Sequence, residues 1–269
     1  MRTLVHLSDL HFGRVDPALL DPLVASVTAV APDLVVVSGD LTQRAKSAQF
    51  AEAARFLERL PQPQVVVPGN HDVPLWNVFA RFVSPLRKYR RHITRDLSPR
   101  YRDDEIAVLG INTARSLVVK NGRINHAQID AVRAEFCDLP DSITKIIVTH
   151  HPFDLPPEFE HDDLVGRAGL AMRTFARCGA DLLLAGHMHT GHAGNTAARY
   201  GIVDHAAVVV QAGTATSTRG RGEANSYNVL RVEPRAIAVA RCEWDEDAAR
   251  FVERAPERFA FDDGVWRRV

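Results

Sequence analysis

The chain has 269 residues, of which 46% are hydrophobic and 25% charged, a composition that excludes a disordered or fibrous protein. Lysine plus arginine and aspartate plus glutamate both number 33, so the net charge is zero, and a dedicated nucleic-acid-binding protein with its usual basic excess is not expected. A chain of this length can bury a large core unaided, so we expect a single catalytic domain over residues 1–269.

The first segment, residues 1–13, is apolar but soon carries Asp9 and His11. It therefore predicts neither a signal peptide nor a spanning helix, and no apolar run of about 18 residues occurs elsewhere, so no transmembrane segment is expected. The three cysteines are widely spaced and odd in number. They favour packed thiols in a reducing compartment over a disulfide framework, and we expect a cytoplasmic protein.

Seven short apolar runs, rich in β-branched residues, predict strands that are covered on both faces. They are residues 4–7, 34–37, 65–67, 106–111, 146–148, 182–184 and 208–210. Amphipathic stretches with helical spacing lie between several of them, around residues 50–60, 129–136 and 170–178. This alternation predicts an α/β fold with a largely parallel core sheet.

Residues 73–105 are expected to form a helical cap insertion. Between Arg81 and Arg95 this segment has six lysines and arginines and no acidic residue, interleaved with Phe82 and Tyr89. One interpretation is a cap that helps select an anionic substrate or a lipid headgroup. The alternative is an ordinary solvated helix face, as charge runs usually are.

The final third has a different pattern. A loop rich in Gly, Ser, Thr and Arg, residues 213–222, leads into two apolar runs, 227–232 and 237–242, that Pro234-Arg235 separates. From about residue 223 we therefore expect a hairpin or β-meander that extends a second sheet. The charged and aromatic tail, 245–269, receives no assigned role.

Most of the predicted strands end in side chains of metal-ligand type. These are Asp9, His11, Asp40, Asn70, His150, His187 and His189. The carboxyl ends of parallel strands share one edge of a sheet, so the seven are expected to converge there. In extended backbone residues i and i+2 point to the same side, which would let Asp9 act with His11. Glycines at 39, 69 and 186 permit tight turns and close backbone approach.

Seven donors are enough for two metal ions that share a bridging ligand. The expected assignment is Asp9, His11 and His189 on one ion, Asn70, His150 and His187 on the other, and Asp40 as the bridge. Two divalent ions against two carboxylates leave positive charge that attracts phosphate, and a metal-bound hydroxide would be the nucleophile. Oxygen and nitrogen donors suit divalent or trivalent Mn, Fe, Zn or Co.

The joint pattern resembles the calcineurin-like metallophosphoesterase superfamily. Its blocks D-x-H, G-D, G-N-H-[DE], a lone His and G-H-x-H all occur in order between Asp9 and His189, over about the first two-thirds of the chain. The resemblance implies a four-layered α/β/β/α sandwich with a dinuclear metal centre. It also implies that His71, which binds no metal, assists the leaving oxygen or stabilises the transition state, and that Asp72 orients His71.

The details indicate a subgroup. Phosphoprotein phosphatases of the superfamily carry G-D-x-x-D-R-G and G-N-H-E, and residues 39–45 and 69–72 depart from both, so protein phosphatase activity is not expected. His150-His151-Pro152 and the compact length look more like bacterial class III cyclic-nucleotide phosphodiesterases. The implied reaction is hydrolysis of a phosphodiester or pyrophosphate bond in a small or nucleotide-type substrate. A phosphomonoesterase and a catalytically weak, metal-stabilised interaction module are the alternatives.

Four further residues are candidates for substrate contact, each with a structural alternative. They are Arg44, Arg115, His151 and His192. The two arginines follow strand ends and are equally consistent with surface residues. His151 competes with His150 as a ligand, and the resemblance favours His150; His192 is as consistent with an ordinary loop. Arg219 and Arg221 are weaker candidates, and a homodimer is a further expectation.

Overall fold

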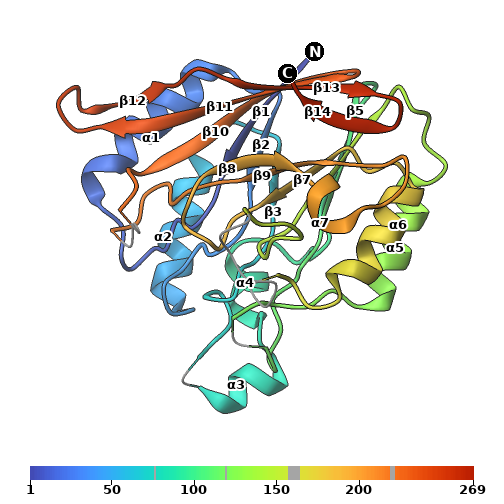
Figure 1. Ribbon diagram of the computed structural model, residues 1–269. Coiled ribbons are helices and arrows are strands. Elements are labelled where there is room, and N and C mark those ends of the chain that lie inside the picture. The colour runs from blue at the N-terminus through green and yellow to red at the C-terminus, as the bar shows by residue number, and fades with distance from the viewer. Residues whose placement is uncertain (76, 119, 157–163, 219–221) are drawn as a thin grey trace.

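Two mixed β-sheets pack face to face in the computed structural model, with helices on both outer faces (Figure 1). The structure describes residues 1–75, 77–118, 120–156, 164–218 and 222–269. The fold is thus α/β with the layer order α/β/β/α, as expected. The parallel strands are divided between the two sheets, and antiparallel strands flank both groups.

The first sheet has eight strands in the order β14-β13-β11-β10-β1-β2-β3, with β12 paired to β11. Its strands are β1 (Arg2–Leu7), β2 (Leu34–Val37), β3 (Gln64–Val66), β10 (Ser226–Glu233), β11 (Ala236–Asp245), β12 (Arg250–Glu253), β13 (Glu257–Asp262) and β14 (Val265–Arg268). β1, β2 and β3 are parallel, and β10 to β14 are antiparallel. The expected meander is therefore present, and the tail, left unassigned above, continues it.

The second sheet has six strands in the order β4-β5-β6-β7-β9-β8. They are β4 (Arg100–Arg102), β5 (Ile106–Gly110), β6 (Thr144–Val148), β7 (Leu182–Ala185), β8 (His192–Asn195) and β9 (Val208–Gln211). The four central strands are parallel, and β4 and β8 are antiparallel edges. All seven runs that predicted strands are strands in the structure.

Three apolar clusters hold the layers together. Alternate residues of β1 serve two of them: Leu4 packs between the sheets, whereas Val5 and Leu7 face the helices outside the first sheet. Because both faces are covered, the strand reads as a continuous apolar run. The first outer layer contains α1 (Pro17–Val30), α2 (Ser47–Glu58) and α4 (Arg87–His92), and α3 (Val78–Val83) precedes α4 in the chain. On the second sheet lie α5 (His126–Phe136), α6 (Ala168–Arg177) and the short α7 (Ala197–Tyr200).

The expected cap segment, 73–105, contains α3, α4 and β4. Figure 1 places α3 at the end of the molecule opposite both termini. Arg81 is buried and donates to the carbonyl oxygens of Ser116 and Pro74, so it fixes α3 to the loop after β5 and is neither solvated nor offered to an anion. Tyr89 of α4 is buried and donates to the carbonyl of Val66.

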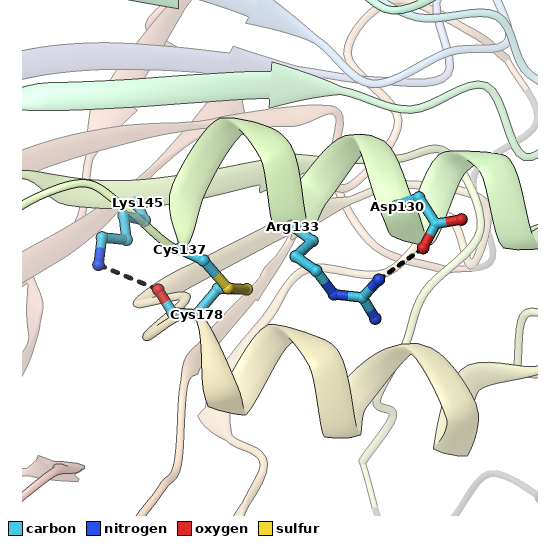
Figure 2. The surroundings of a disulfide bond; sticks show 5 residues. All are labelled: Asp130, Arg133, Cys137, Lys145 and Cys178. Atoms are coloured by element: carbon cyan, nitrogen blue, oxygen red, sulfur yellow. Dashed lines mark hydrogen bonds and ion pairs between the residues drawn. A yellow bond between two sulfur atoms is a disulfide. The ribbon is translucent and has the colours of Figure 1, made fainter.

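The prediction of three packed thiols was wrong. A disulfide joins Cys137 at the end of α5 to Cys178 at the end of α6, and Nζ of Lys145 donates to the carbonyl of Cys178 (Figure 2). Only Cys242 is a free, buried thiol. The spacing of 41 residues gave no sign of the pair, because two different helices bring the cysteines together.

Among the described residues, no helix has the length and apolarity to cross a membrane.

Candidate metal centre

The candidate site lies where the carboxyl ends of strands from both sheets meet. β1, β2 and β3 of the first sheet lead to Asp9, Asp40 and Asn70, and β6 and β7 of the second lead to His150 and His187. The seven predicted donors do converge, but at the junction of two sheets and not along the edge of one. Both sheets direct carboxyl ends to the same end of the sandwich, which is where ligands bind in α/β folds.

The donors stand on turns and not on extended strands. Asp9, His11, Asp40, His187 and His189 all have positive φ, between 51 and 75°. The expectation that Asp9 and His11 face one site because extended residues alternate was therefore wrong in its reason, since β1 ends at Leu7. Left-handed backbone at non-glycine residues is strained and concentrates at functional sites.

One donor group consists of Asp9, His11 and His189, all buried. Oδ1 of Asp9 lies 3.5 Å from Nε2 of His11 and 3.4 Å from Nε2 of His189, and the two imidazole nitrogens are 3.4 Å apart. Ligands about 2.1 Å from a tetrahedral ion are separated by roughly 3.4 Å, so these spacings fit a transition-metal ion held by all three.

The second group consists of Asn70, His150 and His187. Oδ1 of Asn70 lies 3.0 Å from Nε2 of His150 and 3.1 Å from Nδ1 of His187, and these two nitrogens are 3.3 Å apart. Oδ2 of Asp40 lies 3.3 Å from Nε2 of His150 in the second group and 3.8 Å from Nε2 of His11 in the first. This position matches the bridging role expected for Asp40.

The carboxylates themselves test the fit to cations. Asp9 and Asp40 each use one oxygen to accept a backbone N–H, from His187 at 3.0 Å and from His71 at 2.8 Å. Their other oxygens, Oδ1 of Asp9 and Oδ2 of Asp40, are buried without a hydrogen-bond partner among the described residues and face the imidazoles. A buried carboxylate oxygen in that state is costly unless a cation satisfies it, so the donors fit two metal ions.

The buried carboxylates and imidazoles of the site shift one another's pKa values. Burial opposes ionisation of Asp40, but the nearby charge of His150 prevails and holds the pKa of Asp40 well below its ordinary value. Burial likewise opposes protonation of His150, yet Asp40 raises the pKa of His150 to about 9. Burial and then the charge of His150 lower the pKa of His187 to about 3, so His187 is a neutral imidazole, the form that binds metals.

Two groups that the sequence did not identify orient the histidines. Nδ1 of His150 lies 2.8 Å from the carbonyl oxygen of Ser38, and Nδ1 of His189 lies 2.9 Å from the hydroxyl of Thr214. These contacts direct each Nε2 toward the donor groups, as outer partners of metal ligands do. Thr214 lies in the Gly-rich loop noted above, but no local signal could pair it with His189, 25 residues away.

His151 stays close to the site. It is buried, its Nδ1 lies 2.7 Å from the hydroxyl of Thr113, and its ring centroid is 4.7 Å from that of His187. His150, His151 and His187 together also have the spacing to hold an ion. The structure therefore brings both candidate histidines to the second group, and the contacts of His150 with Asn70 and Asp40 favour it as the ligand.

His71 lies half-buried beside the first group, with its ring centroid 4.9 Å from that of His11. Its Nδ1 is 3.0 Å from the carbonyl oxygen of Gln43. Asp72 instead accepts hydrogen bonds from the backbone N–H groups of Leu41, Thr42 and Gly69. The expected role of Asp72 is therefore corrected: it shapes the loops around Asp40 and Asn70, and the Gln43 carbonyl orients His71.

The other residues predicted to contact substrate differ in their surroundings. The guanidinium of Arg115 donates to the carbonyls of Asn112 and Ala114 and to Gln128, so it supports its own loop. Arg44 is exposed. His192 opens the edge strand β8 and is half-buried. Arg219 and Arg221 lie outside the described residues.

Comparisons with known proteins agree with this geometry. The sequence pattern of the calcineurin-like phosphoesterase family matches residues 2–191. The chain is 26% identical over 170 residues, 56% of its length, to the glycerophosphodiester phosphodiesterase GpdQ of Enterobacter lignolyticus (strain SCF1), and spans only 58% of that relative. It is 24% identical to the 3',5'-cyclic adenosine monophosphate phosphodiesterase CpdA of Escherichia coli (strain K12), over 69% of each chain.

Among solved structures, the purple acid phosphatase PPD1 of yellow lupin (Lupinus luteus) superimposes with a TM-score of 0.70 at 10% identity. The superposition covers 94% of this chain and 52% of the lupin protein. At that identity the likeness concerns the fold alone.

Proposed function

This chain belongs to the calcineurin-like phosphoesterase family, and from that premise we propose that it is a phosphodiesterase with two metal ions at the junction of its sheets. The observation that carries the proposal is the pair of donor groups joined by Asp40, with two buried carboxylate oxygens aimed at them. Two bacterial relatives bear the names of phosphodiesterases, and this favours a diester substrate.

In the proposed assignment Asp9, His11 and His189 hold one ion, Asn70, His150 and His187 hold the other, and Asp40 lies between them. When bound, Mn, Fe, Zn or Co ions would neutralise the oxygens of a phosphate and lower the pKa of water. His71 would bind beside that phosphate and carry a proton for the leaving oxygen at Nε2. Its Nδ1–H is retained by the carbonyl of Gln43, and this fixes the tautomer.

Two alternatives remain distinct from this proposal. The same centre in a phosphomonoesterase would prefer p-nitrophenyl phosphate to its bis ester. In a metal-stabilised interaction module the centre would bind ions and support the fold without turnover. Retention of every donor and of His71 favours an enzyme, because an interaction module needs no proton carrier.

The test is hydrolysis of bis(p-nitrophenyl) phosphate by the purified protein with added Mn²⁺. We expect turnover, with D40A inactive and H71A slower by about 10²–10⁴-fold. H126A, at an exposed position on α5, serves as the matched control and keeps wild-type activity. If D40A and H71A hydrolyse the diester as fast as wild type, the enzyme assignment fails.

The native substrate is a separate question. A panel of cyclic nucleotides, glycerophosphodiesters, nucleotide-sugar pyrophosphates and phosphomonoesters addresses it with the same protein. A diester or pyrophosphate turned over faster than every monoester supports the proposal, whereas the reverse order selects the phosphomonoesterase.

A further inference from the structure

The end of the molecule around α3 exposes an unusual number of large apolar side chains. Their exposed fractions are 40% for Leu75, 77% for Phe79, 54% for Phe82, 65% for Val83 and 85% for Leu117. We call these five residues the apolar tip. They account for five of the eight large hydrophobic residues that are exposed in the described part of the chain. Such clustering marks an interaction surface, since isolated exposed hydrophobics are normal and grouped ones are not.

The tip is held as one unit. The buried Arg81 projects from α3 and donates through Nε to the carbonyl of Ser116, at 2.7 Å, and through Nη1 to the carbonyl of Pro74. It therefore ties the helix that carries Phe79 and Phe82 to the residue next to Leu117. A buried guanidinium needs such carbonyl partners, and these hydrogen bonds hold α3 against the loop after β5.

The segments that form this end are strongly cationic. Lys88 donates to the carbonyl of Ala45, which places α4 beside the loop after β2, and Arg81 connects α3 to the loop after β5. These three segments, residues 41–51, 73–95 and 112–129, contain eleven lysines and arginines and no aspartate or glutamate. Eight of the eleven are exposed: Arg44, Lys46, Arg87, Arg90, Arg91, Arg95, Lys120 and Arg123. The whole chain is neutral, so this asymmetry is local.

We propose that the apolar tip and its cationic surroundings dock this protein onto an anionic lipid bilayer. Aromatic and aliphatic side chains next to Lys and Arg are the combination that enters a membrane interface, where the apolar groups reach the acyl boundary and the cations meet anionic headgroups. A second copy of this chain would set one cationic face against another. A nucleic acid would match the charge but would leave the five apolar side chains uncovered.

The docking orientation has a consequence for the candidate metal centre. β1 begins near the N-terminus and ends just before Asp9, so the strand ends that carry the donors point toward the end occupied by α3 (Figure 1). α3 also follows His71 and Asp72 closely in the chain. A bilayer contacted through the apolar tip would therefore lie on the side of the molecule where the metal centre is built.

Co-sedimentation with vesicles tests the proposal. Full-length protein is mixed with vesicles of phosphatidylcholine alone and of phosphatidylcholine with about 30% phosphatidylglycerol. We expect partition into the anionic vesicles that weakens in high salt, and F79S/F82S should bind at least about tenfold more weakly. V203S/V269S removes two apolar side chains that are 82% and 78% exposed outside the tip, and should bind like wild type.

Two readouts keep the outcome independent of folding and of the phosphodiesterase proposal. Far-UV circular dichroism shows whether F79S/F82S is folded, and hydrolysis of the soluble bis(p-nitrophenyl) phosphate shows whether the metal centre is intact. The proposal is overturned if wild type ignores anionic vesicles or if a folded F79S/F82S binds them equally well. It is also overturned if light scattering shows that F79S/F82S converts a dimer to a monomer, because the tip would then be a subunit interface.

Discussion

At the scale of single residues, the site depends on strained backbone. Five of the seven candidate donors lie in the left-handed region, which costs a non-glycine residue about 1–2 kcal/mol. Two buried carboxylate oxygens also have no hydrogen-bond partner among the described residues, so the strain and these oxygens would make the candidate centre unfavourable unless cations bind there. We therefore expect metal binding to contribute substantially to the stability of the fold.

Metal content separates the residues that hold ions from the residue that moves a proton. D40A removes the oxygen between the two groups, so we expect it to retain fewer ions than wild type. H71A should keep the wild-type content, because Nδ1 of His71 contacts the carbonyl of Gln43 and is not directed at the ions. Mass spectrometry of protein-bound metal after dialysis measures both, with D104N at an exposed site as the control. Equal losses in D40A and H71A would contradict this division.

At the scale of elements, tight crossings between strand ends fix the donors. A Cβ added at Gly186 would stand 1.8 Å from Oγ of Ser8 and 2.6 Å from Oδ2 of Asp9. G186A should therefore push β7 away from β1 and displace Asp9, with a loss of about 1–3 kcal/mol in the free energy of unfolding. Urea denaturation measures the loss, and metal content should fall with it.

A second glycine provides the matched control for G186A. A Cβ at Gly169, in the first turn of α6, meets no atom within 4 Å. G169A should be neutral or raise the free energy of unfolding by about 0.5–1 kcal/mol, because alanine loses less backbone entropy than glycine in a helix. Similar losses in G169A and G186A would mean that close approach at Gly186 is not the cause.

Asp181, which directly precedes β7 and accepts a hydrogen bond from Trp266 of the C-terminal hairpin, should make the free energy of unfolding depend on pH. Burial raises the pKa of Asp181 to about 6, although the N–H of Lys145 and the indole of Trp266 donate to its carboxyl. The unfolded pKa is about 3.9, so the folded state holds the proton more tightly. This contribution is complete below about pH 4 and is lost as pH rises through about 6, at most about 2–3 kcal/mol.

Denaturation of D181N across the same range isolates that contribution. Its stability relative to wild type should be lowest near pH 4 and should recover as pH rises through about 6, because asparagine does not titrate. A difference between the two proteins that is constant from pH 4 to 7 would show that Asp181 is not the group responsible.

At the scale of the whole molecule, the disulfide joins two helices at one end of the sandwich and the candidate metal centre lies at the other. Cys137 and Cys178 follow the last turns of α5 and α6, at the amino ends of the strands, and close a loop of 41 residues. Reduction, or C137A/C178A, should lower the free energy of unfolding by about 2–4 kcal/mol. Hydrolysis of bis(p-nitrophenyl) phosphate should persist, since the donors lie at the opposite strand ends.

The remaining cysteine separates this effect from general sensitivity to reductant. C242A lacks the buried free thiol but keeps the disulfide, so dithiothreitol should shift its denaturation midpoint as much as that of wild type. If reduction leaves the midpoint of wild type unchanged, the crosslink does not contribute to stability in solution.

The sequence by itself determined the strands and singled out the candidate donors. Apolar runs such as residues 34–37 predict a strand whichever sheet that strand joins, because a strand covered on both faces must be apolar throughout. Candidate donors at strand ends can also be recognised in the sequence, because the end of an apolar run marks where a strand stops. Parallel strands then bring their carboxyl ends to the same edge of a sheet. That much predicted an α/β fold and one site for Asp9, Asp40 and His187, whereas the α/β/β/α sandwich was implied by the resemblance to the metallophosphoesterase superfamily.

Only the tertiary structure decided how those donors are held. Three features join segments that are far apart in the chain: the division of the parallel strands between two sheets, the contact of His71 with the Gln43 carbonyl, and the Cys137–Cys178 disulfide. A contact between distant segments leaves no periodic trace in either of them, since it depends on how the layers pack. For the same reason the cationic run 81–95 did not reveal that Arg81 is buried and that Phe79 and Phe82 point outward.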